Sequence, residues 1–259
     1  MADVINPAFY AQVNTRLDDM LESFYEATPA ARYLATSSSI DEDLFARHTI
    51  ETILRIRLGR TADSMVIQHF TKTNPFAAQR WCQYTQETML HDRLFLKDLK
   101  HLGLSEETVY GTDPLLATEL LQGYLYYTIE HHGPRGLLSK SYFVEYLTRK
   151  TQAVWNANIK RALGEQAVKG AEALLDGDVA DDHVTEIWNV LMSVVKTLDD
   201  EARVLHHLEV YYGLFIAYFH ELASTTHVDV SGPPPDPAGT AVWGAQRAAR
   251  LGGKRRDAE

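Results

Sequence analysis

Apolar side chains recur every three or four positions along most of this chain, and no stretch alternates in the way a half-buried strand does. A three-to-four period gathers apolar side chains on one face of a helix. The pattern therefore predicts an all-α protein, with a single bundle of seven or eight helices. The main expected helices cover about 7–27, 41–57, 61–70, 75–102, 114–132, 137–163, 183–198 and 199–222.

Helix-breaking residues set most of these boundaries. Asp41 is expected to cap a helix start, because its side chain can accept hydrogen bonds from the free amides of a first turn. Gly59 is expected to interrupt the second helix, Gly103 to end the 75–102 helix, and the pair Gly133-Pro134 to stop another. The segment 27–39 is expected to be a loop.

The character of the chain changes after Thr225. The run 232–237 contains four prolines, and the last residues are polar and charged. The sequence therefore predicts one helical domain over 1–225, followed by a mostly disordered tail over 226–259.

Composition limits the function. The chain has 259 residues and a formal net charge of −10, which disfavours nucleic acid as a partner. Cys82 is the single cysteine, so no intrachain disulfide can form, and it is expected as a small core residue. No apolar run reaches the roughly 18 residues of a membrane span, and no signal peptide is visible. We expect a cytoplasmic protein without a membrane partner, of a size for which homodimers are common.

The segment 86–99 carries the first candidate chemistry. Glu87 and His91 are four residues apart, so on one continuous helix they share a face with Tyr84 and Thr88. A carboxylate and an imidazole in this relation have three ordinary explanations: a salt-bridged core pair, an acid/base pair, or two metal ligands.

Two further positions are candidates on later helices. Glu145 lies in an apolar and aromatic run, where a carboxylate needs a partner; pairing with Arg149 one turn on is the structural alternative. His183 follows two aspartates and is by itself best explained as a helix start. Asp176 precedes it by about two turns and would face the same way on an uninterrupted helix.

Other polar clusters favour structural roles. Adjacent histidines on a helix point about 100° apart, so at most one of His206 and His207 faces inward. His131 and His132 sit at an expected helix C-terminus, where imidazoles complement the helix dipole. The chain has no glycine-rich phosphate loop, no G-x-S-x-G elbow and no Cys/His zinc spacing.

Over about 40–222 the order of these features resembles the haem-oxygenase-like iron-containing oxidases, which share a fold with haem oxygenase and the TenA and PqqC proteins. The matching elements are Glu87 before His91-Asp92, the ending Leu96-Lys97-Asp98-Leu99 with Gly103, and Glu145 after Pro134. The third family element is a histidine, an aspartate four later and a histidine three after that. It is matched here by His183, while its first two positions fall on Asp176 and Ala180.

The resemblance implies a non-haem iron enzyme that uses O2. Fe(II), one or two ions per chain, would be held by Glu87, His91, Glu145, Asp176 and His183, since carboxylates and imidazoles suit that metal. Ala180 removes one expected ligand, which leaves a dinuclear, a mononuclear and a vestigial site open.

The implied reaction is oxidation of a small molecule, either an amine, an amino acid or a fatty acid, by N-oxygenation, desaturation or carbon–carbon cleavage. The setting would be secondary-metabolite biosynthesis, with room for an external electron donor. The alternative is a metal-free helical small-molecule-binding protein or TenA/PqqC-like enzyme, in which Glu87 and Glu145 act as acid/base or hydrogen-bonding groups. A non-catalytic helical partner protein is a third, weaker interpretation.

Overall fold

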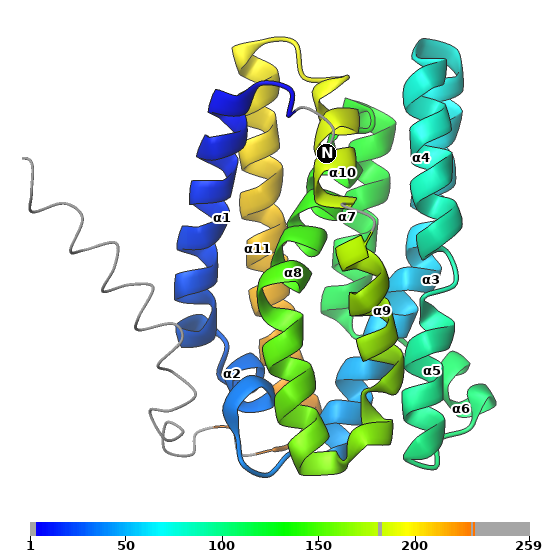
Figure 1. Ribbon diagram of the computed structural model, residues 1–259, viewed down its shortest axis with the longest axis vertical. Helices are drawn as coiled ribbons and strands as arrows, with labels where there is room; N and C mark the ends of the chain where they lie inside the picture. Colours follow the sequence, from blue (N-terminus) through cyan, green and yellow to red (C-terminus); the bar gives the residue numbers. More distant parts are fainter. Residues whose placement is uncertain (1–3, 181–182, 229, 231–259) are drawn as a thin grey trace, which may run out of the picture.

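The computed structural model describes residues 4–180, 183–228 and 230 as a bundle of helices arranged side by side along one long axis (Figure 1). No strand occurs within these residues. The helices are α1 (Pro7–Ala27), α2 (Pro29–Thr36), α3 (Glu42–Thr73), α4 (Pro75–Thr88), α5 (Asp92–His101), α6 (Glu106–Tyr110), α7 (Leu116–His132), α8 (Arg135–Leu163), α9 (Lys169–Ala180), α10 (His183–Met192) and α11 (Leu198–Thr226), with a single 3-10 turn at Glu165–Ala167.

The helix ends follow capping rules visible in the sequence. Asp41 accepts a hydrogen bond from the amide of Leu44 at 2.9 Å, as expected for the start of α3. Thr197 and Asp200 form a reciprocal capping box at the start of α11. The positive φ angles of Gly133 and Gly164 lie just past the ends of α7 and α8, where a left-handed residue is needed.

Two expectations about the first third of the chain are wrong. Gly59 does not interrupt a helix, because α3 runs unbroken from Glu42 to Thr73. A glycine costs a helix only about 1 kcal/mol, which tertiary packing of a long apolar face exceeds. The expected loop over 27–39 instead contains the short helix α2, whose buried face includes Ala31 and Leu34.

The expected single helix over 75–102 is also wrong, and this correction matters for function. The chain leaves the helix at Thr88, turns through residues 89–91, and starts α5 at Asp92 (Figure 1). Asp92 is buried, paired with Arg60 and hydrogen-bonded by the Tyr110 hydroxyl. This paired carboxylate holds the first turn of α5 against its neighbours.

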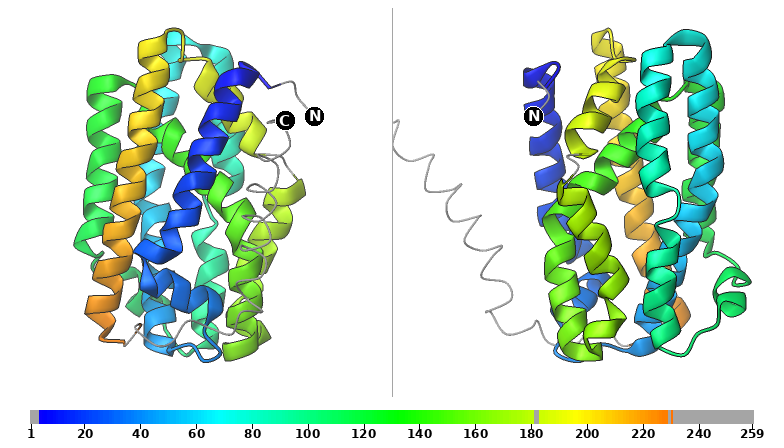
Figure 2. Two further views of the ribbon diagram at one scale, coloured as in Figure 1. Left: turned by 90° about the vertical axis from the view of Figure 1, so that its left-hand side faces the viewer. Right: turned by 45° about the vertical axis from the view of Figure 1, so that its right-hand side comes forward.

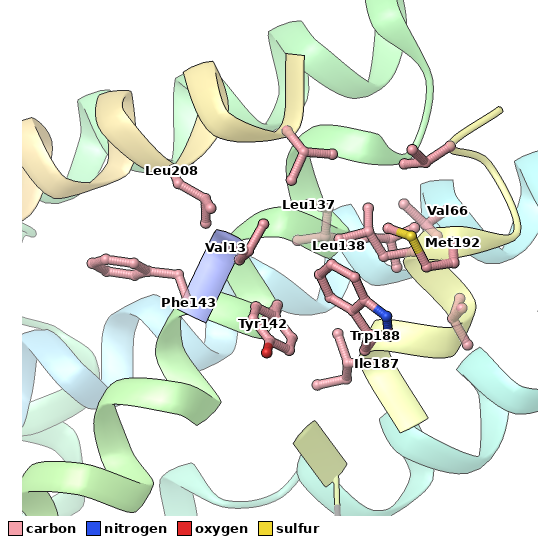
Figure 3. Packing of buried hydrophobic residues seen from close by; sticks show 14 of the residues in the cluster. Val13, Val66, Leu137, Leu138, Tyr142, Phe143, Ile187, Trp188, Met192 and Leu208 are labelled. Carbon is pink, nitrogen blue, oxygen red and sulfur yellow. The ribbon is translucent and has the colours of Figure 1, made fainter. Parts of the chain in front are cut away.

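A large apolar core joins helices from both ends of the chain. Figure 3 shows Trp188 from α10 beside Tyr142 of α8, with Val13 from α1 and Leu208 from α11 in the same cluster. Trp188 is fully buried and its ring centroid lies 5.2 Å from that of Tyr142. Burial of aromatic side chains is a major source of stability, so this cluster fixes α10 against α8.

α5 and α9 are joined by a carboxylate and a glycine. The buried Asp98 accepts hydrogen bonds from the amides of Gly170 at 2.6 Å and Ala171 at 3.1 Å, at the start of α9. A Cβ on Gly170 would lie 2.0 Å from the carbonyl oxygen of Leu94. The Asp98 position of the family-like segment thus anchors the helix that precedes His183.

The first and last described helices lie on the same side of the bundle. Figure 2 shows α1 and α11 running along one side, with α4 and α5 forming another. Residues 231–259, which make up most of the expected tail, lie outside the described residues. Of the helices described, none is long and apolar enough to cross a membrane.

Candidate acid and imidazole site

Glu87 and His183 come together from helices far apart in the sequence. Glu87 lies in the last turn of α4 and His183 begins α10, which packs against both α4 and α8. The Glu87 Oε2 atom accepts a hydrogen bond from His183 Nε2 at 2.8 Å. The imidazole is 3% exposed and the carboxylate side chain 48% exposed, so the pair connects the bundle interior with its surface.

A second acidic group, Glu145, is linked to this pair through Tyr84. The Tyr84 hydroxyl donates a hydrogen bond to Glu145 Oε1 at 3.0 Å, which links α4 to α8. The Tyr84 ring stands edge-on to the His183 ring, with centroids 5.5 Å apart. A chain of contacts therefore runs from Glu87 through His183 and Tyr84 to Glu145. The Tyr84 hydroxyl is a hydrogen-bond partner for the Glu145 carboxylate, which a carboxylate in apolar surroundings needs.

Tyr84 and Glu87 reach the same region because they are three residues apart on α4. The fully buried Trp81 supports Tyr84 from one turn earlier, with ring centroids 4.8 Å apart. Tyr84 also has a polar role, because its hydroxyl donates to Glu145.

His91 does not lie on the helix that carries Glu87. It occupies the turn before α5, so the spacing of four residues no longer places the two on one helical face. The single continuous helix on which this pairing was based is therefore absent, and the proximity of His91 to Glu87 stays a prediction. His183 lies beside Glu87.

The remaining predicted ligand cannot be placed. Asp176 and Ala180 belong to α9, but their side chains lie outside the described residues. Within the part of the chain that is described, no three side chains of His, Cys, Asp or Glu form a group able to hold a metal ion. The structure thus brings together Glu87 and His183, with Glu145 next to them through Tyr84.

Charged groups that the sequence analysis did not select lie inside the same bundle. Burial lowers the pKa of Lys140 on α8, and the negative charges of Asp63 and Glu145 counter that effect. Burial also raises the pKa of Asp63 to about 6, against the nearby charge of Lys140. The sequence offers one signal for Lys140, which interrupts a run of α8 whose neighbouring residues, such as Ser139 and Ser141, are buried.

Of the two adjacent histidines on α11, only one faces inward, as predicted. His207 is buried, with its Nδ1 2.9 Å from the Tyr124 hydroxyl, and burial lowers its pKa to about 4. Its neighbour His206 is exposed. Cys82 is a correction, because the structure places it on the exposed side of α4 rather than in the core.

Comparison with solved structures identifies the architecture. The chain matches a domain of unknown function with a haem oxygenase-like fold from Shewanella denitrificans OS217, with a TM-score of 0.76 over 89% of this chain and 97% of that chain. This chain has a haem oxygenase-like fold. The identity is 21%, so the similarity establishes the fold alone. A scan against protein-family models and a search of curated proteins find no match.

Proposed function

We propose that this haem oxygenase-like protein is a non-haem iron, O2-dependent oxidase or oxygenase that acts on a small molecule, as the segment 86–99 and Glu145 first suggested. The observation that carries the proposal is the Glu87–His183 pair, with Glu145 held beside it by Tyr84. The three groups come from three helices: Glu87 from α4, Glu145 from α8 and His183 from α10. Such convergence inside a bundle is typical of sites built for chemistry.

The carboxylate and imidazole groups of this site are chemically suited to bind iron. Carboxylate and imidazole ligands are those of non-haem Fe(II) oxygenases, which also keep open positions for O2 and substrate. The 2.8 Å between Glu87 Oε2 and His183 Nε2 is close to the separation of two neighbouring donors on one ion, about 3 Å for bonds of about 2.1 Å. Further donors would come from Glu145, His91 or Asp176.

The residues of the chain then have distinct tasks. Glu87 and His183 would hold the metal, which supplies redox chemistry toward O2 when bound. Tyr84 orients the Glu145 carboxylate through its hydroxyl and limits the space beside His183 with its ring. The substrate remains an amine, an amino acid or a fatty acid, and electrons that it does not supply would come from an external donor.

Anaerobic titration with Fe(II) tests this proposal directly. The full chain is expected to retain iron after desalting, and Glu87→Gln and His183→Gln are each expected to weaken iron binding about tenfold or more. O2 consumption by the iron-loaded protein is the second measurement. His91→Ala shows whether the turn before α5 contributes a ligand.

The matched control is His220→Ala, which removes an exposed imidazole from α11. It should leave iron binding unchanged. The proposal fails if the wild-type chain retains no iron, or if the Glu87 and His183 variants retain as much iron as the control.

A second candidate function has its own supporting observation. Glu87 and His183 already form a direct hydrogen bond, and the described residues add no third donor to make a metal-holding group. A metal-free enzyme could use this pair as a proton acceptor and donor. Absence of bound iron, together with a His183 Nε2 proton signal in NMR that Glu87→Gln removes, would favour this alternative.

A further inference from the structure

α7 presents an apolar stripe at the surface of the bundle. Leu116, Leu120 and Tyr127 are each more than half exposed, and they are three of the eight large apolar side chains exposed in the described part of the chain. They share one face of the helix with Gly123, which is also exposed. In its left-hand view, Figure 2 shows α7 at the outer edge of the bundle, beside α11. Monomeric proteins rarely gather exposed apolar side chains in this way, so the stripe indicates an interface.

The stripe has the spacing of a seam between two helices. Its members, at positions 116, 120, 123 and 127, are separated by four, three and four residues, which is the period at which one helix packs along another. Glu119 is the single charged residue between Leu116 and Tyr127. A stripe of this length and composition fits a second helix better than it fits a small ligand.

The stripe is complementary to itself. The midpoint of Leu116 and Tyr127 along the helix, between residues 121 and 122, is also the midpoint of Leu120 and Gly123. When two copies of α7 pack antiparallel about a two-fold axis at this point, Leu120 of each copy meets Gly123 of the other, and Leu116 meets Tyr127. Gly123 has nothing within 4 Å of an added Cβ, so the leucine of the second copy has room there. A parallel pair would instead place the two glycines opposite each other and leave a gap.

The ring of Tyr127 is already supported within its own chain. Its centroid lies 4.5 Å from that of His131 and 5.7 Å from that of His132. A side chain that neighbouring rings hold in this way loses little conformational freedom when a partner binds. Tyr127 is therefore suited to anchor the end of the seam opposite Leu116.

Charges beside the stripe also match in the antiparallel arrangement. α3 lies along one side of α7, because the Tyr126 hydroxyl donates to a backbone carbonyl of α3 at 2.9 Å, and the exposed Glu130 follows one turn later on this side. Before the other end of α7, Arg47 of α3 donates to the Asp113 carbonyl at 2.8 Å. The same two-fold axis brings Glu130 of one copy level with Asp113 of the other, beside Arg47. Because Arg47 also pairs with the buried Glu51, this contact is a rim interaction of small effect.

We propose that the exposed face of α7 is a dimer interface, and that its occupant is α7 of a second copy of this chain, packed antiparallel. α7 has 17 residues and is about 25 Å long, and α3 and α11 widen the face on either side. A face of this size can supply the about 800 Å² per partner of a stable interface. The candidate acid and imidazole groups lie on α4, α8 and α10, so dimer formation does not depend on iron.

Sedimentation equilibrium of the full chain tests the interface. The wild type is expected to be a dimer with a dissociation constant of about 10 μM or lower. Leu120→Glu puts a charge at the centre of the seam and should raise the dissociation constant at least about thirtyfold. Glu130→Lys changes the rim and should raise it about threefold, an effect that high salt should reduce.

Phe76→Glu is the matched control for Leu120→Glu. Phe76 is more exposed than Leu120 and lies in the first turn of α4, where a carboxylate suits the helix dipole. This variant loses a large exposed apolar side chain outside the stripe and should dimerise as the wild type does. Circular dichroism checks that both variants are folded.

Disulfide trapping tests the antiparallel arrangement without relying on a loss of affinity. Cys82 is exposed, so all chains first carry Cys82→Ser. An equimolar mixture of Leu120→Cys and Gly123→Cys chains should form the mixed disulfide in preference to both homodimers. Efficient cross-linking of each variant with itself would indicate a parallel pair and overturn the arrangement.

The proposal fails if the full chain sediments as a monomer, whether another protein or residues 231–259 cover α7. It also fails if Leu120→Glu dimerises as tightly as Phe76→Glu. Iron retention is measured separately, so an iron-binding monomer would overturn the dimer alone, and a dimer that retains no iron would overturn the proposed function alone.

Discussion

Glu87 and Asp98 belong to the same segment of the sequence, yet the fold gives their carboxylates different surroundings. Asp98 is 1% exposed, and both of its oxygens accept backbone amides from the start of α9. Glu87 keeps 48% of its side chain exposed and contacts the imidazole of His183. A turn at residues 89–91 separates the two, so each faces a different part of the bundle.

The difference indicates which acid is structural and which is available for chemistry. Backbone amides at a helix start cannot change protonation, so a carboxylate that they satisfy holds a helix in place. An imidazole can gain or lose a proton or bind a metal, so its carboxylate partner can take part in a reaction. We therefore expect changes around Asp98 to alter stability, and changes at Glu87 to alter binding.

Gly170→Ala should have the largest effect, because the added Cβ would overlap the Leu94 carbonyl and separate α5 from α9. We expect a loss of more than about 4 kcal/mol in the free energy of unfolding, or failure to fold. Urea unfolding followed by circular dichroism measures it.

Gly123→Ala is the control for this change. Gly123 lies on the exposed side of α7 and has nothing within 4 Å of an added Cβ, so alanine should stabilise by about 0.5–1 kcal/mol. Equal effects at the two glycines would show that α5 and α9 do not depend on close packing.

The pH dependence of stability gives a further prediction, which concerns the imidazole of His48 on α3. Burial lowers the pKa of His48 from 6.5 to about 3, and its Nδ1 lies 2.9 Å from the Tyr218 hydroxyl. Between these two pH values the unfolded chain binds the proton and the folded chain does not. The stability contributed by the neutral His48 is therefore complete above pH 6.5 and falls as the pH drops toward 3, by up to about 5 kcal/mol.

His48→Gln should flatten this acid dependence in denaturant titrations at several pH values. His101→Gln, which changes an exposed imidazole, should leave the wild-type profile intact. An unchanged profile in His48→Gln would assign the acid sensitivity to other groups.

Asp98→Ala should cost about 2 kcal/mol, because it leaves the two amides at the start of α9 without acceptors. Hydrogen exchange should show increased opening of residues 169–175 in particular. A global loss with no local increase in exchange would contradict the role of Asp98 as a local anchor.

Glu87→Gln should change stability least, by less than about 0.5 kcal/mol, since the side chain is half-exposed. The same substitution should nevertheless weaken iron binding, as measured in the titration described above. If Glu87→Gln destabilised the chain as strongly as Asp98→Ala, the distinction between the two carboxylates would be lost.

The sequence by itself determined the helical class and most helix boundaries. The three-to-four period, Asp41, the Gly133-Pro134 pair and Gly164 are local signals, and local hydrogen bonding suffices to realise them. The period also predicted that at most one of His206 and His207 faces inward, and the structure shows that His207 is the buried one. The resemblance to haem-oxygenase-like proteins predicted the architecture, which the structural comparison confirms.

Only the tertiary structure decided how the candidate site is assembled. The turn at 89–91 interrupts the helix between Glu87 and His91, and packing of α10 on α4 and α8 places His183 beside Glu87. No local spacing encodes that contact, because it depends on how α10 packs against α4 and α8.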